Sequence, residues 1–151
     1  MFNGIGLTFL PILIDCYVHL DDIGEASRLL FQLAKVGVTT DALDTGHFTG
    51  PVKDSLHSSS GMADVRFTGT FATSTGSIHS RFPGVSKASL IDNPQAAIRF
   101  VEGKVAEGAD YIKIVADVPG MSQEVVNTLV IEARKHRTLT VAYAARNGAP
   151  S

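Results

Sequence analysis

Cysteine is almost absent from this chain: Cys16 is the only one among 151 residues. A single thiol forms no intrachain disulfide, and it cannot supply a cysteine-based zinc site or an iron–sulfur site. An excess of basic charge is absent too, because 13 basic side chains stand against 15 acidic ones, for a formal charge of -2. Such a balance provides no basic surface for nucleic acid or an anionic membrane. We therefore expect a reducing compartment, no nucleic-acid or membrane partner, and a small-molecule ligand.

Long hydrophobic runs are missing as well. The most apolar stretch, residues 5–14, is interrupted by Gly6 and Pro11 and follows no basic segment. It is also shorter than the roughly 20 residues that a membrane-spanning helix requires. We therefore interpret it as the lead-in to a buried strand rather than as a signal peptide, and we expect a cytoplasmic protein.

The composition that remains is typical of one folded domain. Hydrophobic residues make up 44% of the chain and charged residues 19%, so residues 1–151 are expected to form a single domain with a real core. Apolar runs of strand length alternate with segments of helical period, which indicates βαβ units and a parallel sheet. Strands are expected at residues 12–20, 38–43, 65–73, 111–115 and 139–144.

Three helices are expected between these strands, at residues 23–36, 93–108 and 122–137. The first carries apolar side chains at helical spacing and stops before Gly37. Asn93 and Pro94 are suited to be the N-cap and first residue of the second. Ser122 begins the third, which ends in a basic turn that the helix dipole favours.

One segment, residues 73–90, has no clear period and is rich in serine, threonine, glycine and proline. It is expected to be a long loop after the third strand. Loops at the carboxyl ends of parallel strands usually carry the chemistry of α/β proteins. His79 and Arg81 lie in this loop, and His47 follows the second strand, where it would face the same mouth.

The sequence around the first expected strand carries a family resemblance. Residues 13–20, LIDCYVHL, resemble the first barrel strand of imidazolonepropionase- and prolidase-like amidohydrolases, which ends in His-x-His. Two histidines at i and i+2 of a strand point to the same side and reach one divalent cation. This chain keeps the second as His19 and has Tyr17 in place of the first.

Two further strand motifs continue the resemblance in the correct order, and a less specific loop motif accompanies them. Residues 107–114, EGADYIKI, are similar to the family's fourth strand, where the counterpart of Lys113 is carbamylated and bridges two metals. Residues 139–145, LTVAYAA, resemble the strand that has a metal-binding histidine where Tyr143 stands. Residues 76–80, GSIHS, resemble a loop whose histidine, here His79, faces the substrate.

This resemblance implies a partial (βα) barrel derived from an amidohydrolase TIM barrel, with about five parallel strands and flanking helices. The family's small N-terminal β-domain and its later strands, with the remaining metal histidine and the catalytic aspartate, have no counterpart in the sequence. Five strands cannot close an eight-stranded barrel, so a homo-oligomer, most simply a dimer, is expected to cover the open edges. A rearranged open α/β sandwich is the alternative.

The resemblance and the residue types together select the candidate site. The catalytic candidates are Tyr17, Lys113, Tyr143, Asp15 and His79. The substrate-binding candidates are His19, His47, Arg81 and Thr73. A bare ammonium in an apolar strand is costly, and carbamylation, a depressed pKa or a partner carboxylate would relieve the cost at Lys113.

Each candidate has a plainer interpretation. The two tyrosines are equally explained by drift or deliberate substitution, and Asp15 by a polar group of the core. For the loop residues His79 and Arg81, a solvated side chain is the commoner outcome.

Three functions follow from these candidates. The first is metal-independent acid/base chemistry on a carbonyl compound, such as isomerisation, cyclisation, addition or elimination, because two metal-binding imidazoles are replaced by phenols. In that scheme no cofactor is needed. The second is a residual metal-dependent hydrolase of C–N or ester bonds, with a vestigial zinc held by His19 and Lys113. The third is a non-catalytic pseudoenzyme that binds a ligand.

Overall fold

The computed structural model describes residues 5–6, 8, 11, 13–15, 18–20, 22–44, 51–57 and 59–144. Two of the candidate residues, Tyr17 and His47, lie outside this part of the chain. No helix within it is both long enough and apolar enough to cross a membrane.

Five short parallel strands and four α-helices alternate along the chain. The strands are β1 (Leu13–Asp15), β2 (Val38–Asp44), β3 (Asp64–Phe67), β4 (Tyr111–Ala116) and β5 (Leu139–Ala144). The helices are α1 (Ile23–Lys35), α2 (Pro51–Leu56), α3 (Pro94–Ala106) and α4 (Gln123–Lys135). Every expected strand is present, although β1 and β3 are shorter than expected. The short helix α2 was not expected.

The helices begin where side-chain caps allow them to begin. Asn93 Oδ1 accepts the amide hydrogen of Ala96 at 2.9 Å, and Ser122 Oγ accepts that of Val125 at 3.3 Å. Both caps satisfy amides that the first turn of a helix leaves without a partner. The predicted starts of α3 and α4 are therefore confirmed.

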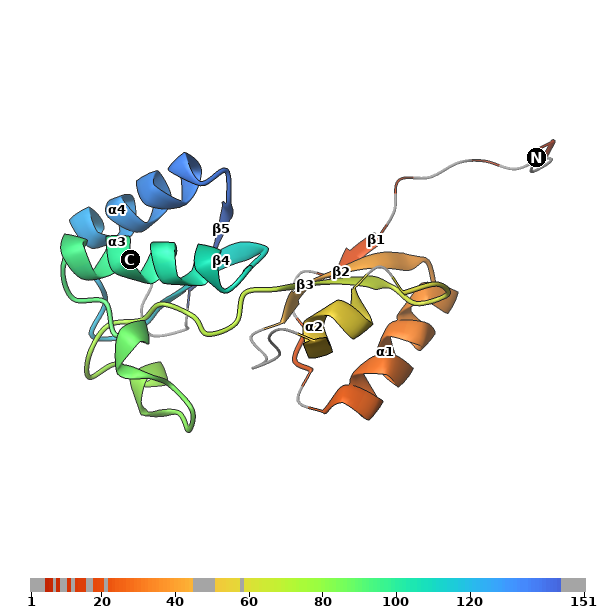
Figure 1. The fold of residues 1–151 in the computed structure, drawn as a ribbon, viewed down its shortest axis with the longest axis horizontal. Helices are drawn as coiled ribbons and strands as arrows, with labels where there is room; N and C mark the ends of the chain where they lie inside the picture. Colours follow the sequence, from red (N-terminus) through yellow and green to blue (C-terminus); the bar gives the residue numbers. More distant parts are fainter. Residues whose placement is uncertain are drawn as a thin grey trace.

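The strands form two parallel sheets that follow chain order, β1-β2-β3 and β4-β5. Figure 1 shows them in two halves of the molecule, with α1 and α2 beside the first sheet and α3 and α4 beside the second. The chain after β3 connects them, because Ala72 pairs in parallel with Ile114. Within the described residues, β1 pairs only with β2 and β5 only with β4, so the strands form no closed barrel.

A reciprocal contact at the amino end of β4 holds the two halves in register. Phe67 N donates to Asp110 Oδ2 at 2.8 Å, and Asp110 N donates to Phe67 O at 2.8 Å. Lys53 of α2 adds an ion pair to the same carboxylate at 3.2 Å. Because the carboxyl end of β3 meets the amino end of β4 in this way, the chain that leaves β3 continues alongside β4.

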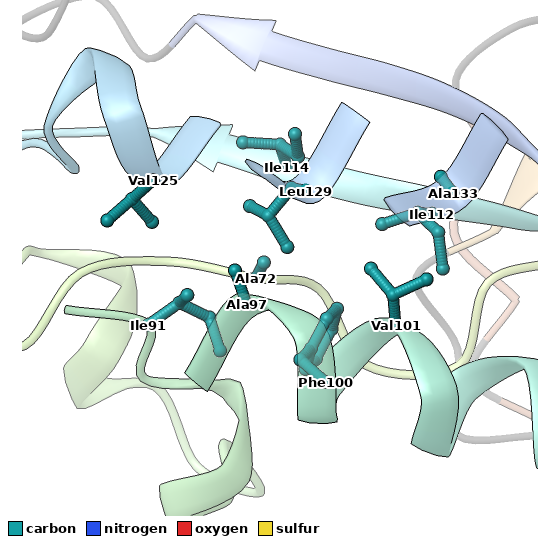
Figure 2. Packing of buried hydrophobic residues seen from close by; sticks show 10 residues of the cluster. All are labelled: Ala72, Ile91, Ala97, Phe100, Val101, Ile112, Ile114, Val125, Leu129 and Ala133. Atoms are coloured by element: carbon teal, nitrogen blue, oxygen red, sulfur yellow. The ribbon is translucent and has the colours of Figure 1, made fainter. Parts of the chain in front are cut away.

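One hydrophobic core lies between β4 and the helices α3 and α4. Figure 2 shows its buried side chains pointing toward one another: Ala72, Ile91, Ala97, Phe100, Val101, Ile112, Ile114, Val125, Leu129 and Ala133. Since successive side chains of a strand alternate between its faces, Ile112 and Ile114 face the helices, and Lys113 and Val115 point to the opposite face. That opposite face carries the candidate site.

The outer strands correct one expectation. The first strand was expected to be buried, but Leu13 is 58% exposed and Ile14 is 52% exposed. Leu139 of β5 is 75% exposed in the same way. Both β1 and β5 are the outermost strands of their sheets. In contrast, β4 is covered by helices and is buried along almost its whole length. A continuous apolar sequence occurs in both kinds of strand, so it did not distinguish an exposed outer strand from a buried one.

Candidate functional site

A close polar contact near the carboxyl ends of the strands joins His79 to Asp117. Asp117 follows β4 directly, and His79 lies in η1 (His79–Arg81), a single 3-10 turn in the loop after β3. The imidazole Nδ1 lies 2.7 Å from Asp117 Oδ2, and the backbone N of His79 donates to the same oxygen at 2.8 Å. The amide of Val118 donates to Oδ1 at 2.8 Å. Both carboxylate oxygens are therefore bound.

Burial and hydrogen bonding oppose each other at Asp117. Its side chain has no exposed surface, and burial acts to raise the pKa of the carboxyl. The hydrogen bonds from His79 and Val118, together with the charge attraction of His79, outweigh burial and lower the pKa from its ordinary value of 3.8. Asp117 is consequently an ionised acceptor at neutral pH.

This pairing determines the state of the imidazole. An ionised carboxylate only accepts hydrogen bonds, so the His79 Nδ1 that contacts it must carry a hydrogen. In the neutral ring, Nε2 then holds the lone pair and is the basic atom. The side chain of His79 is 20% exposed, so a ligand can approach the ring.

Three aromatic rings surround His79. Phe71 meets it edge-on with ring centroids 6.0 Å apart, and Phe82 lies 4.7 Å away at a tilt of 48°. Tyr143 of β5 is also edge-on, at 6.2 Å and 77°. These contacts restrict the ring to one orientation, and they bring two of the sequence-predicted residues, His79 and Tyr143, together.

Lys113 lies on the same face of the sheet as Tyr143. In the parallel register, Lys113 is opposite Val141, and Val115 is opposite Tyr143. Register partners share a face, so the lysine and the tyrosine are one pleat apart along it. Lys113 is only 3% exposed, as its place within an apolar strand led us to expect.

Thr73 anchors the loop that carries His79. It is completely buried, and its hydroxyl lies 3.0 Å from Ser77 Oγ. Ser77 in turn accepts from the amide of Ser80 at 3.1 Å. This chain of contacts begins the turn that places the imidazole, so the location of Thr73 favours a structural contribution over its predicted contact with substrate. Arg81, the neighbouring candidate, is exposed and donates to Gly76 O at 3.4 Å.

The candidates near β1 lie in the other half of the molecule. Asp15 ends β1, and Figure 1 shows β1 and β5 in different halves. His19 is exposed and lines an open groove of about 490 Å³ beside α1, together with Glu25 and Arg28. The structure therefore groups His79, Tyr143 and Lys113, and it places Asp15 and His19 apart from Tyr143.

Asp117 is the residue that sequence reasoning missed. The sequence feature that could have identified Asp117 is its position directly after the buried apolar strand β4. It follows Lys113 by four residues, and side chains at even spacing along a strand share one face. In α/β folds, side chains at the carboxyl end of a strand are positioned for chemistry.

The described donors do not fit the two-metal centre that the resemblance implied. Among the described residues, no three His, Cys, Asp or Glu side chains come close enough to hold a metal ion. The imidazole of His79 and the carboxylate of Asp117 bind each other instead, and Tyr143 contributes a phenol. A zinc site ordinarily has at least three protein ligands.

Comparison with known proteins identifies the class of fold. No family model and no curated protein matches the chain. Several solved structures match the chain. One is an uncharacterized protein at 17% identity and a TM-score of 0.65, and another is a Xaa-Pro dipeptidase with bound methionine in its active site, at 18% identity and a TM-score of 0.65. An amidohydrolase matches at 22% identity and TM-score 0.64.

Each match covers 89% of this chain but only 42 to 43% of the solved structure. The chain thus has the fold of part of an amidohydrolase-type structure. The expected resemblance in fold is confirmed for this partial domain, with five short parallel strands and four α-helices and without closure of a barrel.

Proposed function

We propose that this chain is an acid/base enzyme acting without a resident metal on a small carbonyl compound, with His79 as the general base. The observation that carries the proposal is the 2.7 Å contact between His79 Nδ1 and the buried Asp117 carboxylate. Such a pair orients an imidazole, sets its tautomer and stabilises the imidazolium that forms when the ring takes a proton.

The chemistry would begin at a carbon next to the carbonyl group. His79 Nε2 takes the proton as the C–H bond breaks, and the electron pair moves onto the carbonyl oxygen. Lys113 and the Tyr143 hydroxyl, which share one strand face, would stabilise that developing oxyanion by hydrogen bonding. Return of the proton to a different atom completes an isomerisation, and loss of a leaving group completes an elimination. Tyr17, which lies outside the described residues, remains a candidate for the second proton transfer.

The second candidate function is metal-dependent hydrolysis of C–N or ester bonds. It is favoured by the fold, which matches part of a Xaa-Pro dipeptidase and of an amidohydrolase. The two candidates differ in their need for metal, and ligand binding without turnover would instead support a pseudoenzyme.

We expect turnover of a carbonyl substrate to be unchanged after dialysis against a chelator, because the described donors belong to an imidazole–carboxylate pair rather than to a metal cluster. Metal content by elemental analysis and rate are measured on the same sample. A rate that falls with the metal content and returns when zinc is added would contradict the metal-independent proposal, and hydrolysis of a C–N or ester bond under the same conditions would establish the hydrolase.

We also propose that the chain self-associates through its outer strands. Leu13 and Ile14 of β1 and Leu139 of β5 expose large apolar side chains beside backbone edges that pair on one side only within the described residues. Light scattering at micromolar concentration is expected to give a dimer mass, and Leu139→Lys to shift it toward the monomer. Ile131→Lys, on the exposed face of α4, is the matched control. A monomeric wild-type chain would rule this out.

A further inference from the structure

Exposed apolar side chains surround the His79–Asp117 pair. We call this set the apolar rim, and it consists of Ile78, Phe82, Val118 and Tyr143. Ile78, Phe82 and Val118 are each 47 to 48% exposed, and Tyr143 is 36% exposed. Isolated exposed apolar residues are ordinary on protein surfaces, but a group of them at one place marks an interaction site.

The rim is continuous with the pair. Ile78 precedes His79 in the chain, and Val118 follows Asp117. The rings of Phe82 and Tyr143 both contact the imidazole, at 4.7 and 6.2 Å between centroids. A ligand that reaches the exposed part of His79 therefore meets an aromatic ring from the loop after β3 and another from β5, while Ile78 and Val118 are the chain neighbours of the pair.

The charges around the rim favour a ligand without a positive group. Asp117 is fully buried and its carboxylate is already bound by His79 and Val118, so it has no exposed surface for a ligand cation. The charged residue that follows within η1 is Arg81, an exposed cation. Aromatic side chains pair favourably with further aromatic rings in edge-on or offset geometry.

We propose that the apolar rim binds the side group of the substrate, and that this group is aromatic and lies next to the carbonyl on which His79 acts. The proposal rests on the proposed function for the position of the carbonyl, but the binding of the aromatic group can be tested without turnover. Two neutral probes are suited to the test, 3-phenylpropanamide and propanamide, because they share the carbonyl group and differ by one phenyl ring.

The test is an NMR titration of the histidine ring signals with each probe. The chain has five histidines, and the signal that disappears in His79→Gln belongs to His79. We expect 3-phenylpropanamide to shift the His79 signal and to bind at least about tenfold more tightly than propanamide, as burial of a phenyl group predicts. Phe82→Ala is expected to remove most of this advantage. Ile131→Ala, an exposed apolar residue of α4, is expected to keep it.

Two substitutions of Tyr143 separate the contribution of its aromatic ring from that of its hydroxyl group. Tyr143→Phe keeps the ring and should bind the phenyl probe as the wild type does, whereas Tyr143→Ala should bind it more weakly. If Tyr143→Phe binds normally but loses turnover, the ring serves the rim and the hydroxyl serves the chemistry.

Three results would overturn the inference. These are equal affinity for the two probes, binding that leaves the His79 signal unmoved, and a His79 signal that broadens with protein concentration alone, which would make the rim a self-association surface. Tight binding of the phenyl probe without turnover of any carbonyl compound would contradict the proposed function and leave the aromatic site established.

Discussion

His79→Ala is expected to lower kcat by about 10²- to 10⁴-fold, the range that a positioned general base contributes. The rate is measured on the carbonyl compound that a substrate screen of the wild-type chain identifies. Free imidazole should restore part of the lost rate, because the substitution opens a space between Phe71, Phe82 and Tyr143 that a planar ring fills. A residue that only supports the loop would show no such rescue.

The matched control is His136→Ala, which removes an imidazole that lies 3.5 Å from Glu132 at the end of α4. Its kcat should equal that of the wild type, with or without added imidazole. If both variants lose activity equally, or if His79→Ala keeps the wild-type rate, His79 is not the base.

Asp117→Asn is expected to lower the free energy of unfolding by about 1 to 3 kcal/mol at neutral pH, since it weakens hydrogen bonds to a fully buried group. The pH dependence has a definite sign. Because the folded-state pKa of Asp117 lies below its ordinary value of 3.8, the ionised carboxylate stabilises the fold at pH values above 3.8. This contribution is lost as the pH falls through the lower folded-state pKa, so the difference between wild type and variant should shrink in acid.

Urea unfolding of both chains from neutral to acidic pH measures this difference. Asp92→Asn is the control, because Asp92 also anchors the loop, accepting from Thr75 N at 2.9 Å, but it is exposed and contacts no imidazole in the described structure. Its effect should be about 0.5 kcal/mol or less. A difference at Asp117 that grows in acid would contradict the lowered pKa.

The Asp117→Asn variant also tests whether Asp117 orients His79 for proton transfer. An amide at position 117 no longer favours a hydrogen on His79 Nδ1, so the ring can present the wrong tautomer to the substrate. The loss of kcat should therefore approach that of His79→Ala, as for other orienting carboxylates. Wild-type activity in Asp117→Asn would show that the contact is structural only.

Much of the fold was predictable because its signals are local. Helical spacing and the caps Asn93 and Ser122 predicted the starts of α3 and α4, and apolar runs predicted β4 and β5. The short helix α2 was missed, since its six residues hold too few turns for a period to be seen. The exposure of β1 was missed because a continuous apolar run is the same in a central strand and in an outer one.

The candidate site was predictable only in part. Lys113 and Tyr143 were found because their strands resemble metal-binding strands of the family, and His79 because its loop resembles a substrate-facing one. For Lys113, the cost of a charge within an apolar strand pointed the same way. Asp117 was missed because a carboxylate after a strand has many ordinary explanations until its partner is known. That partner lies 38 residues earlier in a segment without a period, and no local pattern connects the two.

The sequence by itself determined that the chain is an α/β protein of parallel strands and that it resembles amidohydrolases, and that resemblance predicts Tyr17 and Tyr143 where the family has metal-binding imidazoles. Only the tertiary structure decided which polar groups meet. Pairing of Ala72 with Ile114 aligns the segment after β3 with β4, and this alignment places His79 against Asp117. Periodicity acts within one strand or helix, whereas a site at the ends of several strands depends on contacts between segments distant in the chain.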